Sequence, residues 1–107
     1  DYVYVTDVAK ASVLAINDRA YGDVFNVASG ESHTIIDVAN IANEVTGNTS
    51  RLEFISKPND QKHLSEDSRK YVIDITKIKG ILDYKPAVNL RCGMEFTKDW
   101  ILLNKSG

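Results

Sequence analysis

Short runs of β-forming residues alternate along this chain with stretches in which apolar residues recur every three or four positions. The β-forming runs are 2–5, 24–28 and 51–56, and 71–73 is a candidate for a fourth. Helical spacing of apolar residues follows the first run, then occupies roughly 35–46, 75–82 and 90–103. This order predicts an α/β fold with three to four short strands and four helices.

Polar residues mark the expected helix ends. Thr34 and Asp37 have the spacing of a capping box, and Gly47 suits the left-handed residue that ends a helix. The expected N-terminal caps are Thr6 or Asp7 for the first helix, Thr34 for the second, Asp74 for the third and Asn89 for the fourth.

Residues 57–70 form the longest stretch without a periodic pattern. They are polar and contain a single leucine, Leu64. A loop of this length inside a compact domain is often a binding segment or a lid. We therefore expect 57–70 to be a substrate loop.

Length and composition indicate one small globular domain covering residues 1–107. Of the 107 residues, 43% are hydrophobic and 26% are charged, which is typical of a folded domain. The net charge of −2 argues against nucleic-acid binding, which requires a basic excess. The apolar runs are far shorter than the roughly 20 residues that span a bilayer, so no membrane segment is expected.

The few cysteines and histidines limit the chemistry further. Cys92 is the only cysteine, so it has no partner for an intrachain disulfide, and a cytoplasmic location is the default expectation. His33 and His63 lie thirty positions apart without ligand-like neighbours, so no metal site is expected.

Five segments in a fixed order carry a resemblance to a known family. They are DYVYVTDVAKA at 1–11, GDVFNVASG at 22–30, DSRKYVIDITKI at 67–78, LDYKP at 82–86 and GMEFTKDW at 93–100. Together they resemble the late segments of the extended short-chain dehydrogenases/reductases, the NAD-dependent nucleotide-sugar epimerases and 4,6-dehydratases. The resemblance covers essentially the whole chain.

The resemblance implies a position within such an enzyme. The chain is similar to the C-terminal substrate-binding portion of a Rossmann-type protein, and it begins inside the first motif. It is therefore expected to be a piece of a longer protein. The implied ligand is a nucleotide-diphosphate sugar linked to UDP or dTDP. An epimerase and a dehydratase both remain open, although the Arg-Lys-Tyr run at 69–71 favours dehydratase-like relatives.

Two sites that the family's chemistry requires have no match in the sequence. A dinucleotide site needs a glycine-rich turn between a strand and a helix, and no two of the six glycines are close enough to form one. The catalytic pair of the family is a tyrosine with a lysine four residues later, and none of the five tyrosines has that lysine. We expect no cofactor site and no catalytic residue here, NAD belonging to the longer parent, so this chain alone is predicted to be inactive.

Three residues are the candidates for substrate binding. The resemblance places Asn26 near the nucleotide-sugar and Arg69 at the diphosphate, where a guanidinium can donate two hydrogen bonds at once. Asp67 is expected to orient Arg69 or to bind a ribose hydroxyl. The alternatives are a strand-end asparagine bound to nearby backbone and a solvated surface arginine. Asp7 is expected to be structural, at the start of a helix.

Three functions remain open on the sequence alone. The first is the nucleotide-sugar-binding lobe of an epimerase or dehydratase. The second is a stand-alone, non-catalytic module that binds nucleotide-sugars or another protein, and the third is a truncated remnant without a ligand. An exposed apolar face would also favour self-association, because large apolar patches rarely remain bare in water.

Overall fold

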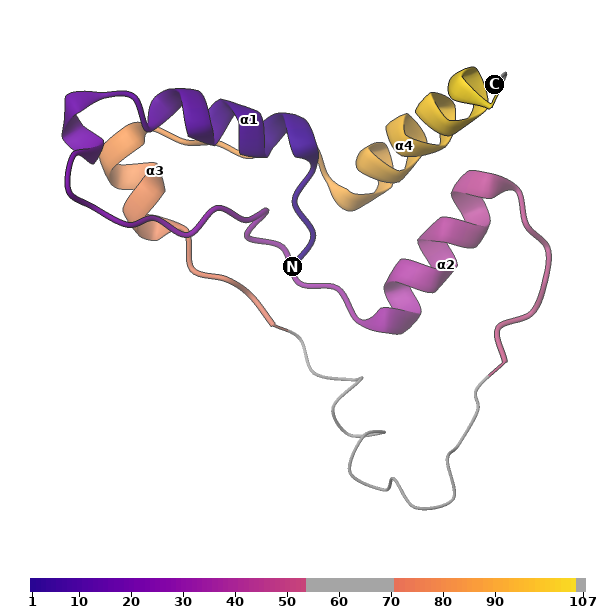
Figure 1. Ribbon diagram of the computed structural model, residues 1–107. Coiled ribbons are helices and arrows are strands. Elements are labelled where there is room, and N and C mark those ends of the chain that lie inside the picture. The colour runs from indigo at the N-terminus through magenta and orange to yellow at the C-terminus, as the bar shows by residue number, and fades with distance from the viewer. Residues whose placement is uncertain (54–70, 106–107) are drawn as a thin grey trace, which may run out of the picture.

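The computed structural model describes residues 1–53 and 71–105 (Figure 1). Its helices are α1 (Val5–Leu14), the short 3₁₀ helix η1 (Asp18–Ala20), α2 (Ile35–Thr46), α3 (Thr76–Leu82) and α4 (Leu90–Asn104). The helix α2 packs beside α4, and α3 packs against η1 beneath α1. The four expected α-helices are thus present. The substrate loop at 57–70, and with it Asp67 and Arg69, lies outside the described residues.

The expected strands do not form in the described part of the chain. Residues 24–30 and 71–75 have no regular secondary structure, and the run 2–5 leads directly into α1. A β-forming sequence gives a strand only where a neighbouring backbone completes a hydrogen-bond ladder. The prediction of three to four strands is therefore unsupported within 1–53 and 71–105, and 24–30 is instead held by side chains that bind its backbone.

Helix α1 begins earlier than the sequence predicts. Its N-cap is Tyr4, which makes no side-chain capping bond, and neither Thr6 nor Asp7 caps the helix. Asp7 lies in the first turn of the helix, with its carboxylate fully buried. The prediction failed because a partner far along the chain binds this carboxylate in place of the helix's own N–H groups.

The other helix ends follow the local sequence closely. In α2, Thr34 and Asp37 form both bonds of the capping box, and Gly47 ends the helix with a φ of +68°. In α4, the Asn89 side chain accepts a hydrogen bond from the Cys92 N–H at 2.9 Å. The predicted cap of α3 is one residue early, since Ile75 is its N-cap and Asp74 accepts from Thr76 N–H at 2.8 Å.

The core lies where α1, η1 and α3 meet the segments around residues 28 and 84. Its buried members are Ala11, Ala20, Ala28, Ile75, Ile78, Leu82 and Tyr84. The end of α4 is different. The helical spacing of apolar residues over 90–103 predicts that Trp100 and Ile101 face inward, but they are 65% and 42% exposed. Ile101 lines a groove with Ala42 and Val45 of α2, so the side of α4 that faces α2 is partly covered.

None of the helices at 1–53 and 71–105 combines the length and apolar character that crossing a bilayer would require.

Candidate functional site

The segment 24–30, which has no regular secondary structure, is the centre of the candidate site, and Lys77 of α3 holds its first residues. The Lys77 ammonium donates to the Val24 carbonyl at 3.0 Å and forms an ion pair with Asp23. It also lies 5.0 Å from the centre of the Phe25 ring, within the range of a cation–π contact. The ion pair lowers the pKa of Asp23.

Asn26 is exposed, and its side chain joins two distant segments. The amide Nδ2 donates a hydrogen bond to the Asp74 carbonyl oxygen at 3.3 Å. Asp74 precedes α3, so Asn26 ties the segment 24–30 to the start of that helix. The structure therefore places Asn26 beside Asp74, which follows Asp67 and Arg69 in the sequence, while the role of Asn26 in binding stays a prediction.

Tyr84 holds the segment 24–30 at Ala28. Its ring is almost completely buried, at 1% exposure, and its hydroxyl donates to the Ala28 carbonyl at 3.1 Å. Burial, together with the negative charge of Asp7, raises the pKa of Tyr84. Tyr84 therefore stays protonated as a hydrogen-bond donor.

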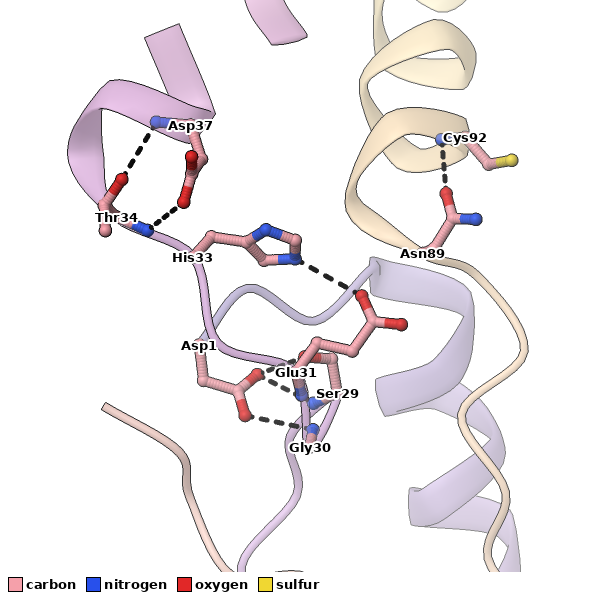
Figure 2. Close-up of polar contacts among 9 residues, drawn as sticks. All are labelled: Asp1, Ser29, Gly30, Glu31, His33, Thr34, Asp37, Asn89 and Cys92. Atoms are coloured by element: carbon pink, nitrogen blue, oxygen red, sulfur yellow. Dashed lines mark hydrogen bonds and ion pairs between the residues drawn. The ribbon is translucent and has the colours of Figure 1, made fainter. Parts of the chain in front are cut away.

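Asp1 closes the far end of the segment, as Figure 2 shows. One carboxylate oxygen accepts hydrogen bonds from the Ser29 N–H at 2.8 Å and the Ser29 hydroxyl at 2.6 Å. The other accepts from the Gly30 N–H at 3.0 Å. Both oxygens thus bind one turn, in which Gly30 has a φ of +73°.

The residues between this turn and α2 make further polar contacts. His33 and Glu31 approach to 3.3 Å, and the capping box of Thr34 and Asp37 follows directly (Figure 2). Within 1–53 and 71–105, no three His, Cys, Asp or Glu side chains gather as metal ligands would. Hydrogen bonds thus connect the turn at Ser29 and Gly30 with Asp1, and Thr34 with Asp37 at the start of α2.

Asp7 organises the side of the site that faces α4. Its Oδ2 accepts from the Ala87 and Val88 N–H groups at 3.0 and 2.9 Å, and Oδ1 lies 3.4 Å from the Lys10 ammonium. Burial alone would raise the pKa of Asp7, but the bonds from Val88 and Ala87 and the charge of Lys10 bring it below its ordinary value. The expectation that Asp7 is structural agrees with these contacts.

Sequence reasoning missed Asp1 and Tyr84. Each lies within a segment that carries the family resemblance, at 1–11 and 82–86, and that was the available signal. The pairing itself was not readable, because Asp1 meets Ser29 across 28 positions and Tyr84 meets Ala28 across 56.

Comparison with known proteins assigns the chain to a family. Residues 1–97 match the family model described as GDP-mannose 4,6 dehydratase. A dTDP-glucose 4,6-dehydratase of Actinoplanes sp. is 30% identical over 107 residues, which cover 99% of this chain and 32% of the relative. A UDP-N-acetyl-alpha-D-glucosaminuronate decarboxylase of Bacillus cytotoxicus is 24% identical over 99 residues, which cover 92% of this chain and 31% of the relative.

Solved structures give the same result. The Bordetella bronchiseptica enzyme WbmF, in complex with NAD⁺ and UDP, aligns with a TM-score of 0.76 and 28% identity, over 99% of this chain and 29% of that one. The UDP-glucose 4-epimerase of Thermotoga maritima, solved with UDP-glucose, aligns with a TM-score of 0.76 and 32% identity, over 99% and 32%.

These matches confirm the resemblance to nucleotide-sugar epimerases and dehydratases that the five sequence segments indicated. The chain spans 31% and 32% of the length of the two curated relatives described above. The family model matches residues 1–97 of the 107 residues, and the chain therefore belongs to the GDP-mannose 4,6-dehydratase family.

Proposed function

We propose that this chain is the nucleotide-sugar-binding lobe of an NAD-dependent nucleotide-sugar epimerase or dehydratase. The observation that carries the proposal is the alignment of 99% of the chain with an enzyme solved with UDP and with another solved with UDP-glucose. The sequence contains neither a glycine-rich dinucleotide turn nor the tyrosine–lysine pair of the family. Cofactor binding and proton transfer are therefore assigned to residues outside 1–107.

The proposed binding face is the exposed side of Asn26. Its amide has two N–H donors and one carbonyl acceptor, and the bond to Asp74 uses one donor. The remaining donor and the acceptor are suited to hydroxyl and carbonyl groups of a nucleotide-sugar. Lys77 holds the backbone just before Asn26 and Tyr84 holds it just after, so the side chain is presented from a fixed segment.

Arg69 and Asp67 complete the proposal from the sequence alone. A guanidinium matches the paired oxygens of a diphosphate, and a nearby carboxylate can orient it or accept from a ribose hydroxyl. In the sequence, Arg69 precedes by five positions Asp74, whose carbonyl oxygen accepts a hydrogen bond from the Asn26 amide.

A titration followed by NMR tests this function. We expect UDP, dTDP and UDP-glucose to shift the resonances of Asn26 and of residues 67–70, and Asn26→Ala to weaken binding about tenfold. Asn40, exposed on α2, provides the matched control, and Asn40→Ala is expected to bind as the wild type does. Absence of any shift at millimolar ligand would refute a binding lobe in this chain.

The diphosphate contact has its own pair of variants. Arg69→Lys keeps the charge but loses the planar fork, so we expect binding of UDP to weaken about as much as in Arg69→Ala. Arg51→Ala removes an equivalent charge from an exposed arginine and is expected to leave binding unchanged. Equal losses in the variants of Arg69 and Arg51 would indicate that only the overall charge matters.

The absence of catalysis is tested by an activity assay. Hydride transfer needs a nicotinamide and proton transfer needs a positioned acid or base, so we expect no turnover of UDP- or dTDP-sugars by this chain with NAD. Turnover above that of buffer would contradict the assignment.

A stand-alone interaction module is the second candidate, and the outer face of α1 favours it. Val5 and Val13 are each 67% exposed and lie two helical turns apart on one face, with exposed Ala9 between them. Ile16 extends this outer stripe beyond the helix and is 81% exposed. We propose that the isolated chain self-associates through this stripe, because an apolar row of this length is rarely left in water.

A further inference from the structure

We propose that Asp1 is a positioning residue for nucleotide-sugar binding, because it fixes the Ser29–Gly30 turn that keeps Asn26 in place. This inference rests on the proposed function of the Asn26 face. Asp1 would not touch the ligand. It would act through the backbone that carries Asn26.

The carboxylate is well suited to holding this turn. Two successive backbone N–H groups, of Ser29 and Gly30, point to one anion, and the Ser29 hydroxyl adds a third donor. Consecutive N–H groups of this kind form a concave anion site, and hydrogen bonds to a charged acceptor are stronger than neutral ones. Figure 2 shows both Asp1 oxygens directed at the turn.

The turn is packed directly against the segment that binds Asn26. A Cβ atom added to Gly30 would lie 3.0 Å from the Ile75 Cδ1 atom, so the two residues are in close contact. Ile75 is buried and follows Asp74, whose carbonyl accepts the Asn26 amide. Movement of the turn therefore changes both ends of the Asn26 contact, the backbone at 26–29 and the acceptor at 74.

An asparagine cannot reproduce the Asp1 contacts fully. Its single amide oxygen can still accept from Ser29, but its NH₂ group has no lone pair for the Gly30 N–H. Asp1→Asn should therefore release Gly30 while leaving Ser29 bound, and Asp1→Ala should release both. A graded series distinguishes these contacts from a simple effect of charge.

The first measurement uses the free protein. In NMR spectra of Asp1→Ala and Asp1→Asn, we expect the side-chain amide of Asn26 and the backbone amides of Ile75 and Thr76 to shift, more in the alanine variant. Asn89→Ala provides the control, because it removes a helix cap of α4 without touching the turn. Unchanged Asn26 resonances in a folded Asp1→Asn variant would overturn the inference.

The second measurement is the affinity for UDP-glucose. We expect Asp1→Ala to weaken binding about tenfold, Asp1→Asn to recover part of that loss, and Asn89→Ala to stay within about twofold of the wild type. Should Asp1→Ala fail to fold, Asp1→Asn alone decides. Equal affinity of Asp1→Asn and the wild type, or an equal loss in Asn89→Ala, would leave Asp1 with no positioning role.

The two measurements separate this inference from the proposed function. A wild-type chain that binds no nucleotide-sugar would refute the binding lobe and, with it, the role of Asp1 in binding. In that event the spectra of the free variants would still show whether Asp1 places the Asn26 side chain.

Discussion

The Asp7 carboxylate accepts a hydrogen bond from the Val88 backbone N–H at 2.9 Å, although the two residues are 81 positions apart. The same oxygen accepts from the Ala87 N–H at 3.0 Å. One buried side chain of α1 thereby fixes the chain just before α4. The Asp7 side chain is completely buried. If it is removed, the Ala87 and Val88 N–H groups lose their hydrogen-bond acceptor, and burial limits its replacement by water.

Replacement of Asp7 should destabilise the fold by an amount that depends on the new side chain. Asp7→Ala leaves the Ala87 and Val88 N–H groups without an acceptor, which we expect to cost about 1–3 kcal/mol of unfolding free energy. Asp7→Asn keeps an acceptor oxygen and should cost less. Urea unfolding at neutral pH measures both variants, and equal costs would argue against hydrogen bonding as the cause.

The pKa of Asp7 also predicts a loss of stability in acid. Its folded pKa lies below the ordinary value of 3.8, so its contribution is complete above that value and is lost as the pH falls through the folded pKa. Asp7→Asn should therefore lose less stability than the wild type between neutral pH and acid. Asp18→Asn, which changes an exposed carboxylate, serves as the comparison. Parallel pH profiles for wild type and Asp7→Asn would contradict this prediction.

Tyr84→Phe should remove the donor that binds the Ala28 carbonyl. We expect a cost of about 1 kcal/mol, and Tyr21→Phe should cost nothing measurable because Tyr21 is 95% exposed. The raised pKa of Tyr84 favours its protonated form in the folded chain. Stability from this group is therefore complete below its ordinary pKa of 10.0 and is lost as the pH rises through the folded pKa. Unfolding measured from neutral to alkaline pH should show this loss in the wild type and not in Tyr84→Phe.

Two helical glycines should respond differently to alanine. Gly80 in α3 has nothing within 4 Å of an added Cβ, so Gly80→Ala should stabilise the fold by about 0.5–1 kcal/mol through helix propensity. At Gly93 in α4, an added Cβ would lie 3.1 Å from the Tyr4 Cδ2 atom. The Tyr4 ring also packs against Phe96, with the ring centres 5.6 Å apart. Gly93→Ala should therefore gain less than Gly80→Ala or destabilise. Thermal unfolding of the two variants checks the order, and a larger gain at Gly93 would contradict it.

A charge on the outer stripe of α1 should reduce self-association. We expect the wild-type chain to form dimers or larger species with increasing concentration, and Val13→Glu to shift it toward the monomer, because the glutamate would bring a charge into an apolar contact. Asn40→Glu adds the same charge to an exposed position of α2 and should leave the association unchanged. Sedimentation velocity distinguishes these outcomes, and a monomeric wild type at all concentrations would exclude the stripe as an interface.

Local sequence predicted the helices well because their signals act over one turn. The bonds between Thr34 and Asp37 and between Asn89 and Cys92 join residues three positions apart, and they form wherever the chain becomes helical. At Asp74, the predicted helix start is wrong by one residue. Asp74 binds the first residue of α3, but the N-cap is its neighbour Ile75.

The strand prediction failed for a physical reason of the same kind. The residues of 24–28 favour an extended backbone, but a strand also needs a second backbone at its side, and 24–28 has no regular secondary structure. In the described chain, that place is taken by side chains from elsewhere: Lys77, Tyr84 and Asp1. No local pattern identifies such partners in advance.

The sequence by itself thus determined the family, the order of the helices and most of their ends. The tertiary structure alone decided that Asp7 is a buried tie instead of a helix cap, that Tyr84 supports Ala28, and that Asp1 holds the turn at Ser29 and Gly30. The reason is the distance along the sequence over which each interaction acts. Capping and periodicity depend on neighbours within a few residues, whereas a buried carboxylate or hydroxyl binds whichever distant backbone group the folded path brings to it.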